Sequence, residues 1–392
     1  MLESLQLAPP DPILGLAEAY RADPNPNKIS LSVGVYKDAD GKTPILDCVK
    51  EAERRLLADE PNKAYLAIDG LSEYATLTRD LLLAKCVEES CAATVQTPGG
   101  TGALRVAADF LQRCVGTSRI WVSAPTWANH GSVFGAAGLA VDSYPYMDDS
   151  SKGLNLDAMV ASLSSIPAGD AVLLHACCHN PTGIDPAADQ WGRIANVIRE
   201  RDLMPVIDCA YQGFGDGLEE DAAGLRRIAG DGEAIVCSSF SKNFGLYAER
   251  IGALTVVGGG PDATAAALSQ VKACVRANYS NPPKHGGAIV SIVLADRDLR
   301  SRWEREVADM RTRIRDMRSL FVEAMKAQGV DRDFAFILNQ KGMFSFSGLT
   351  RLQVDQLRND HSIYIVGSGR INVAGITPAN VDQLAAAIAA VL

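Results

Sequence analysis

The sequence predicts an α/β fold with a large domain, whose mostly parallel central sheet is flanked by helices, and a smaller α/β domain built from both chain ends. Five short apolar runs alternate with helical patterns, and nearly continuous apolar runs are typical of strands covered by helices on both faces. The runs are 120–122, 171–175, 204–207, 234–237 and 253–257. Such alternation indicates a parallel sheet. At about 100–200 residues per domain, the 392 residues suggest two domains.

Two helical segments mark the C-terminal third of the chain. The first is predicted from Leu299 to about Gln328, where Gly329 ends it. Its apolar residues are spaced four and three positions apart: Trp303, Val307, Met310, Ile314, Met317, Phe321 and Met325. The last helix is predicted to begin with Thr377 as its N-cap and Pro378 in its first turn. It should bury Val381, Leu384, Ala385 and Ile388. Since the first helix is long enough to reach from one domain into another, we place the large domain at 44–309 and the small domain at 1–43 and 310–392.

The composition excludes several classes of protein. Hydrophobic residues make up 47% and charged residues 22%, as in a globular chain. The 38 Lys and Arg against 47 Asp and Glu give a net charge of −9, which argues against nucleic-acid binding. No apolar run reaches the roughly 18–20 residues that span a membrane, and the N-terminal MLESLQLAPP lacks the features of a secretion signal. The nine cysteines form no CxxC pair, so we expect reduced thiols in a cytoplasmic protein and no metal site.

The segment SSFSKNFGLYAER at 238–250 follows an apolar strand and contains Lys242, the first candidate catalytic residue. A lysine in this place is more often a charge on a surface loop. Here small hydroxyl residues flank the lysine, and Arg250 follows eight residues later. The segment could therefore hold an anion beside an amine whose pKa is lowered by burial and by a neighbouring cation.

Two further candidates follow other predicted strands. Asp208, in MPVIDCAYQG, lies at the carboxyl end of a buried strand, where parallel sheets bind ligands. The alternative for Asp208 is a helix cap or a structural ion pair. Asn180, in CCHNPTG, is held extended by the proline that follows it, so its amide can be aimed at a ligand. The alternative for Asn180 is a simple turn.

A glycine-rich segment, TPGGTGALR at 97–105, opens a predicted helix and could bind an anion. Its small residues expose backbone N–H groups at the positive end of the helix, where phosphate is favoured, although many loops are glycine-rich. A second segment, GVYKDADGKT at 34–43, ends like a phosphate loop but has six residues between its glycines, where the motif needs four. We therefore expect no nucleoside triphosphate site.

Taken together, these segments resemble those of the aspartate and aromatic aminotransferases, fold type I enzymes that use pyridoxal 5′-phosphate (PLP). The resemblance covers essentially the whole chain and rests on spaced motifs in the right order. The motifs are DPILGL at 11–16, HNPTG at 179–183, SKNFGLY at 241–247 and SGRINVAG at 368–375. The resemblance implies PLP as the cofactor and a central sheet of the seven-stranded type.

The resemblance also implies a role for each matching residue around the cofactor. Lys242 matches the lysine that forms the Schiff base with PLP, and Asp208 matches the carboxylate paired with the pyridinium nitrogen. Around the ring, Tyr211 and Asn180 match the donors to the 3′-oxygen, Trp127 matches the indole stacked on the ring, and His130 and His175 match its polar surroundings. Around the phosphate, the matching residues are Gly100, Thr101, Ser239 and Arg250. Tyr65 matches a tyrosine that reaches the phosphate from the other subunit. The expected catalytic residues are Lys242, Asp208, Tyr211 and Trp127.

Two arginines imply the class of substrate. Arg370 matches the arginine for the substrate α-carboxylate, and Arg276 matches the arginine of the partner subunit for a side-chain carboxylate. Gly34, Trp127 and Asn180 complete the implied substrate site. The implied activity is ping-pong transamination of aspartate and 2-oxoglutarate to oxaloacetate and glutamate. A homodimer with shared active sites would carry it out, with no membrane or nucleic-acid partner.

Two alternatives remain at this point. The first is an aminotransferase for Phe, Tyr or Trp, or an enzyme of dual specificity. Residues around the side-chain pocket resemble the aspartate enzymes: Val35, Lys37, Thr43, Thr101 and Asn281. Ala64, however, replaces the asparagine that is usual before the tyrosine. The second alternative is a non-enzymatic binding protein that kept the fold, but every catalytic position is filled and no basic arm is present.

Overall fold

The computed structural model describes residues 2–7, 14–148, 150 and 152–392. The chain divides into two compact units, one formed by Pro44–Thr312 and the other by Met1–Thr43 with Arg313–Leu392. The first three residues of the DPILGL motif, 11–13, lie outside the described residues.

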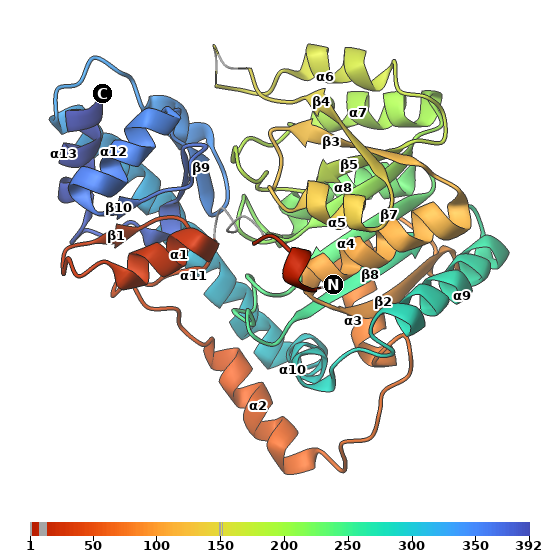
Figure 1. Ribbon diagram of the computed structural model, residues 1–392. Coiled ribbons are helices and arrows are strands. Elements are labelled where there is room, and N and C mark those ends of the chain that lie inside the picture. Colours follow the sequence, from red (N-terminus) through yellow and green to blue (C-terminus); the bar gives the residue numbers. More distant parts are fainter. Residues whose placement is uncertain (1, 8–13, 149, 151) are drawn as a thin grey trace. The chain divides into compact units, whose positions relative to one another are not determined.

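The unit 44–312 contains a seven-stranded sheet in the order β2-β8-β7-β6-β5-β3-β4 (Figure 1). Its strands are β2 (Ala92–Pro98), β3 (Arg119–Ala124), β4 (Ala140–Pro145), β5 (Ala171–His175), β6 (Met204–Cys209), β7 (Ala234–Ser239) and β8 (Ile251–Val257). β8 is antiparallel to both of its neighbours, and the other pairs are parallel. The predicted α/β fold with a mostly parallel sheet is confirmed.

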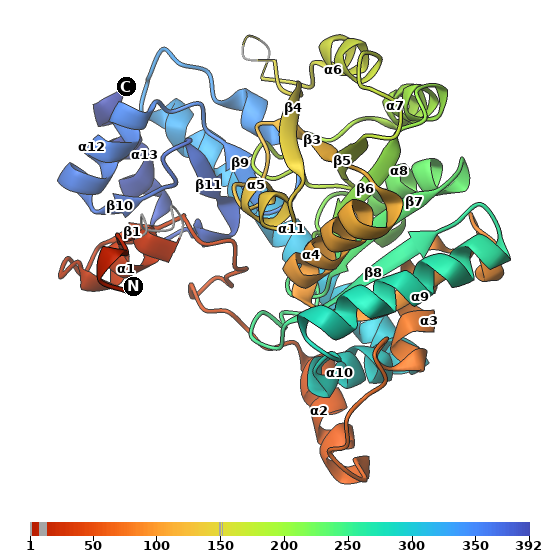
Figure 2. The same ribbon diagram turned by 45° about the vertical axis from the view of Figure 1, so that its right-hand side comes forward.

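Helices cover both faces of this sheet (Figure 2). One face packs against α4 (Gly99–Phe110), α5 (His130–Ala136) and α9 (Pro261–Asn278), and the other against α3 (Ser72–Leu83), α6 (Leu156–Leu163), α7 (Ala188–Glu200) and α8 (Leu218–Gly230). In β7, Ile235 and Cys237 join the first core, whereas Ala234 and Val236 join the second. Because side chains alternate along a strand and both faces are covered, the strand reads as a continuous apolar run.

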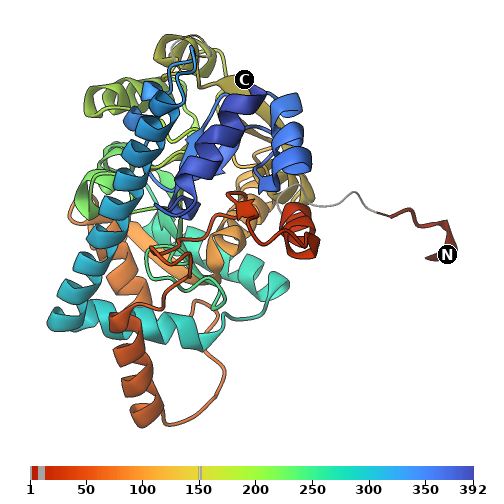
Figure 3. The ribbon, with the colours of Figure 1, turned by 90° about the vertical axis from the view of Figure 1, so that its left-hand side faces the viewer.

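The remaining elements of this unit frame the sheet. α2 (Asp47–Asp59) and α10 (Lys284–Ala295) pack against each other, and α10 also packs against α3. Two short turns of helix, η2 (Glu89–Cys91) and η3 (Leu111–Val115), precede β2 and follow α4. The long helix predicted at 299–328 is α11 (Arg297–Ala327), which is continuous and contributes residues to both units (Figure 3).

The unit built from both chain ends has two small sheets. β1 (Ile29–Ser30) pairs in parallel with β10 (Ile363–Tyr364), and β9 (Phe344–Phe346) pairs antiparallel with β11 (Arg370–Asn372). Its helices are α1 (Leu14–Ala22), α12 (Arg351–His361) and α13 (Val381–Val391), with short turns of helix at η1 (Leu2–Ser4), η4 (Ala335–Asn339) and η5 (Val373–Gly375).

The predicted start of the last helix is wrong by one turn, because α13 begins at Val381 rather than after a Thr377 cap. The side chain of Asn380 accepts a hydrogen bond from the N–H of Thr377 at 2.9 Å and donates one to the carbonyl of Gly375 at 3.0 Å. These bonds close a turn over 377–380 that competes with the helix. The four predicted apolar residues of α13 are all buried.

All nine cysteines are free in the structure. Among the helices that the structure describes, none combines the length and apolar character that a membrane crossing requires.

Candidate active site

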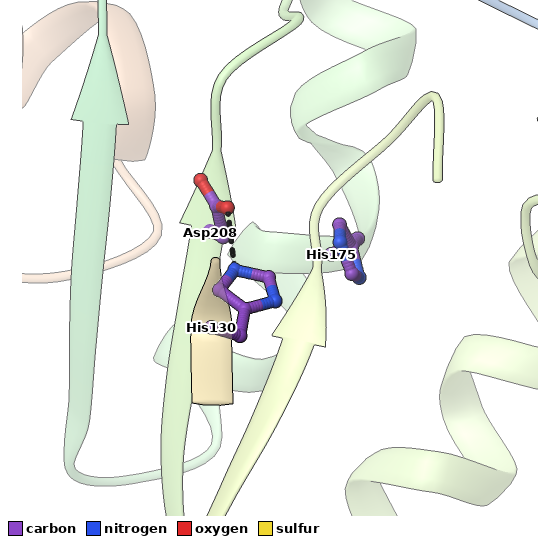
Figure 4. A group of neighbouring side chains, drawn as sticks. All are labelled: His130, His175 and Asp208. Atoms are coloured by element: carbon purple, nitrogen blue, oxygen red, sulfur yellow. Dashed lines mark hydrogen bonds and ion pairs between the residues drawn. The ribbon is translucent and has the colours of Figure 1, made fainter. Parts of the chain in front are cut away.

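The carboxyl ends of the parallel strands meet at one edge of the seven-stranded sheet, and several of the predicted site residues gather there. His175 ends β5 and is paired in register with Asp208 near the end of β6. His130 is the first residue of α5, and its Nε2 lies 3.1 Å from Oδ2 of Asp208 (Figure 4). All three side chains are buried. The fold thus brings together residues that are far apart in the sequence.

Asp208 carries a negative charge inside the protein. Burial would raise its pKa, but the hydrogen bond from His130 and nearby positive charge, including that of Lys242, hold the pKa below its ordinary value of 3.8. His130 is fixed in turn by Thr126, whose Oγ1 lies 2.8 Å from its Nδ1, and its ring meets the ring of Trp127 edge-on at 5.1 Å between centroids. A buried carboxylate that stays ionised favours a cation at this edge of the sheet.

Lys242 lies in the loop between β7 and β8 and is half-buried, so the alternative of an exposed surface charge does not hold. Its Nζ lies 4.8 Å from the centroid of the buried Tyr211 ring. Its charge is also close enough to lower the pKa of Asp208. The structure therefore brings a lysine amine, a phenol and an ionised carboxylate to one place.

The loop that carries Lys242 is anchored by contacts that sequence reasoning missed. The amide of Asn243 donates to the carbonyl of Gln212 at 3.1 Å, and the carbonyl of Asn243 accepts from the indole N–H of Trp303 at 2.8 Å. Trp303 is fully buried and stacks on Phe244 with ring centroids 4.6 Å apart. The apolar spacing of α11 marked Trp303 as a core residue but carried no signal for its hydrogen bond.

The loop after Tyr211 is held by Asp221 on α8, a second residue that sequence reasoning missed. The carboxylate of Asp221 accepts hydrogen bonds from the N–H groups of Gly213, Gly215 and Asp216 at 2.8, 2.9 and 2.9 Å. Burial nevertheless raises the pKa of Asp221. The three bonds fix the backbone that follows the tyrosine.

Asn180 follows β5 and is buried. The residue before it, His179, is locked at both ring nitrogens: Nδ1 lies 2.8 Å from Oγ1 of Thr182, and Nε2 lies 2.8 Å from Oγ of Ser123. Burial and neighbouring rings lower the pKa of His179 well below its ordinary value. A neutral histidine with a hydrogen-bond partner at each ring nitrogen thus fixes the backbone next to Asn180. A simple turn, the alternative for Asn180, would not need these two bonds.

The glycine-rich segment opens α4 at the same edge of the sheet. Because β2 pairs with β8, the end of β2 lies beside the start of β8. A Cβ atom on Gly99 would lie 2.6 Å from Nη2 of Arg250, and one on Gly100 would lie 3.1 Å from Cβ of Ser239. Thr101 follows in the first turn of the helix. The predicted anion-binding residues therefore converge on one helix N-terminus.

Two predicted residues of this unit lie outside the buried group. The side chain of Tyr65 is 93% exposed. Arg276, near the end of α9, is exposed and donates a hydrogen bond to the hydroxyl of Ser280. Among the residues that the structure describes, neither Tyr65 nor Arg276 makes a hydrogen bond or ring contact to His130, His175 or Asp208 of the same chain.

Arg370 and Gly34 belong to the unit built from both chain ends. Arg370 is 4% exposed, donates to the carbonyl of Ser32, and lies over the ring of Phe344 at 4.1 Å from the centroid. A Cβ atom on Gly34 would lie 2.6 Å from Cζ of the same ring. Phe344, which sequence reasoning missed, therefore joins the two predicted substrate residues.

Comparison with known proteins shows what the chain is similar to. The family model for class I and II aminotransferases matches residues 26–388. The aspartate aminotransferase of Salmonella typhi is 54% identical over an alignment of 396 positions, which covers 100% of both chains. The aromatic-amino-acid aminotransferase of Pseudomonas aeruginosa is 49% identical and covers 98% of this chain and 97% of its own. A solved structure, the aromatic-amino-acid aminotransferase of Burkholderia pseudomallei covalently bound to pyridoxal phosphate, matches with a TM-score of 0.97 at 47% identity, over 100% of this chain and 99% of that one.

Proposed function

Because the chain belongs to the class I and II aminotransferase family, we propose that it transfers the amino group of aspartate to 2-oxoglutarate, with PLP as its cofactor. Membership makes it an aminotransferase, which acts on amino acids and 2-oxo acids. The observation that carries the proposal is the buried, ionised Asp208 beside His130 and the amine of Lys242. We further propose that Pro44–Thr312 is the cofactor-binding domain and that two copies of the chain share their active sites.

The residues at this edge of the sheet fit the cofactor. An ionised carboxylate in a buried site suits a protonated ring nitrogen, which Asp208 would hold. A dianionic phosphate suits the N-terminus of α4, where Gly100, Thr101 and Ser239 would donate hydrogen bonds and Arg250 would supply positive charge. Side chains larger than glycine at the start of α4 would fill the space beside Arg250.

When bound, the cofactor would supply the electron sink that accepts the electron pair left when the Cα–H bond of an amino acid breaks. Lys242 would anchor the cofactor through its amine. When it does not hold the cofactor, Nζ of Lys242 in its neutral form would take the proton from the substrate Cα as a general base. Tyr211 and Asn180 would donate to the ring oxygen, and Trp127 would cover the ring face.

Two arginines would select the substrate. A guanidinium binds a carboxylate through two parallel hydrogen bonds. Arg370 would bind the α-carboxylate, and Arg276 of a second copy of the chain would bind the side-chain carboxylate. Removing one partner of a buried ion pair costs about 3–5 kcal/mol, or about 10²–10³·⁵ in affinity or rate, which is enough to set specificity.

Aromatic substrates are the second candidate. Relatives named as aromatic-amino-acid aminotransferases are 46–49% identical to the chain, and Ala64 lacks the side-chain amide that is usual at its position. The relatives at 54% identity are named as aspartate aminotransferases. Lys37 and Asn281 resemble the residues of the aspartate enzymes at these places. These features support aspartate as the main substrate.

The test is a comparison of kcat/KM for aspartate and phenylalanine with 2-oxoglutarate as the acceptor. We expect a higher value for aspartate, and we expect Arg276→Leu to lower that value by about 10²-fold while changing the value for phenylalanine much less. A higher value for phenylalanine would favour the second candidate. Retention of both the visible absorption of bound cofactor and the activity in Lys242→Ala would contradict the proposal as a whole.

Shared active sites can be tested with two inactive variants. Lys242→Ala removes the amine, and Arg276→Leu removes the arginine that the second copy would supply. After unfolding and refolding together in equal amounts, half of the dimers would contain one of each chain, with one complete site in two. The mixture should therefore regain about a quarter of the wild-type activity toward aspartate. A mixture that stays as inactive as its parents would contradict shared sites.

A further inference from the structure

The cluster of His130, His175 and Asp208 has the composition of a metal site as well as that of a cofactor wall (Figure 4). One ligand atom of each residue lies within 4.8 Å of the other two, and all three side chains are buried. Two imidazoles and one carboxylate are a ligand set that Zn²⁺ and related ions take, with a fourth position left open. Each residue comes from a different element: α5, β5 and β6.

His175 points to a ligand because both of its ring nitrogens are buried without a hydrogen-bond partner among the described residues. Its side chain is 6% exposed, so it is more than nine-tenths buried. Burial and the neighbouring His130 lower the pKa of His175 to about 3. A neutral imidazole with a nitrogen lone pair is the form that binds a metal ion.

His130 and Asp208 are already spaced as two ligands of one ion. Ligands at about 2.0–2.1 Å from a tetrahedral Zn²⁺ lie about 3.3–3.4 Å apart. The distance between His130 Nε2 and Asp208 Oδ2 is 3.1 Å. Metal-bound histidines usually donate their second N–H to an oxygen, and Oγ1 of Thr126 lies 2.8 Å from Nδ1 of His130. A ligand atom of His175 lies within 4.8 Å of those of the other two residues, so His175 must move closer to complete the set.

A second cluster of possible ligands shows by contrast what a poor site looks like. Cys177, Cys178 and Asp221 also lie within 4.8 Å of one another. Both carboxylate oxygens of Asp221, however, already accept backbone N–H groups. Hydrogen bonds to neighbouring thiols, together with burial, raise the pKa of Cys177, so the thiolate that a metal requires is disfavoured. The histidine cluster contains no thiol. Its own hydrogen bond, between Nε2 of His130 and Oδ2 of Asp208, would have to give way to the ion, with the imidazole proton moving to Nδ1 beside Thr126.

We propose that the cofactor-free chain binds one divalent transition-metal ion of the Zn²⁺ class through Nε2 of His130, a ring nitrogen of His175 and the carboxylate of Asp208. The ion would occupy the place at Asp208 that the proposed function gives to the ring nitrogen of PLP, so metal and cofactor would exclude each other. This exclusion rests on the proposed function, whereas metal binding itself does not. The charge of Lys242 opposes the ion and would keep the affinity moderate.

The test is a titration of full-length, cofactor-free protein with Co²⁺, whose visible absorption reports four-coordinate binding. We expect one Co²⁺ per chain, displaced by Zn²⁺, and a loss of at least about tenfold in affinity in His175→Leu. The matched control is His285→Leu, which removes an exposed histidine from α10 and should bind Co²⁺ as the wild type does. His175→Gln, checked by circular dichroism, provides a second variant if the leucine variant does not fold.

Competition completes the test. This experiment needs only the wild-type protein. Zn²⁺ should slow its uptake of PLP, and a chelator should restore the rate. Failure to bind Co²⁺, or equal binding by the wild type and a folded His175 variant, would overturn the metal site. Full uptake of PLP with Co²⁺ still bound would overturn the exclusion. A chain that binds Co²⁺ but never PLP would leave the metal site standing and contradict the proposed function instead.

Discussion

His175 is buried, and neither ring nitrogen has a hydrogen-bond partner in the part of the chain that the structure describes. This predicts an unusual response of stability to pH in the cofactor-free protein. Its pKa falls from an ordinary value of 6.5 to about 3 on folding. The unfolded chain therefore takes up a proton below pH 6.5, whereas the folded chain does so only near pH 3. Acid thus favours the unfolded state throughout this window, and the stability that depends on a neutral His175 is lost as the pH falls.

The magnitude follows from the two pKa values. Between pH 7 and pH 5 the loss is about 2 kcal/mol, because each factor of ten in proton affinity corresponds to about 1.4 kcal/mol. His175→Leu should remove this loss. At pH 7 the variant should be no less stable than the wild type, since it also removes two buried nitrogens that lack partners and cost about 1–3 kcal/mol.

The assay is urea unfolding at pH 7, 6 and 5 in the presence of a chelator, followed by circular dichroism. The wild type and the exposed-histidine control His285→Leu should lose stability in parallel, whereas His175→Leu should lose about 2 kcal/mol less. An identical pH dependence in all three proteins would refute the argument that His175 stays neutral on folding. A large loss in His175→Leu at pH 7 would show that its nitrogens are satisfied after all.

Three further predictions concern residues around the site. Trp303→Phe should lower the free energy of unfolding by about 1–3 kcal/mol, because the carbonyl of Asn243 loses its buried donor; a change below about 0.5 kcal/mol in urea unfolding would contradict this. Asp221→Ala should cost about 3 kcal/mol or more, since three backbone N–H groups lose their acceptor, and a melting temperature equal to that of the wild type would speak against it. Gly99→Ala should weaken the binding of PLP by at least about tenfold, because φ of Gly99 is +75° and the new Cβ would collide with Arg250. The control Gly232→Ala should not weaken binding, because its new Cβ has no atom within 4 Å. Equal dissociation constants for the two variants would count against the anion site.

The sheet could be predicted where a strand consists of a nearly continuous apolar run. All five predicted runs became strands of the seven-stranded sheet. β4 was missed because it is an edge strand in which only Tyr144 is buried, so it leaves no apolar run. β2 was missed although it is mostly buried, because Thr94, Gln96 and Thr97 interrupt its apolar residues. The start of α13 was misplaced because Asn380 binds the backbone of Thr377, and nothing in the sequence ranks that turn above a threonine cap.

Sequence patterns mark the candidate residues that lie at or beyond the end of a buried strand or that belong to a known motif. Asp208, Asn180 and Lys242 are of this kind. Trp303 and Asp221 could not be found in this way, because they act through hydrogen bonds to backbone atoms of distant or neighbouring loops. Such contacts depend on how helices pack against the sheet, which local sequence patterns do not encode.

The reversed direction of β8 has a consequence for how this chain can vary. The segment that carries Lys242 and Arg250 leaves the sheet at Ser239 and re-enters it opposite that same residue, at Gly252. Both ends of the segment are therefore tied to neighbouring ladder positions. An insertion or deletion between them would move the amine and the guanidinium together, so this stretch should tolerate changes of side chain far better than changes of length.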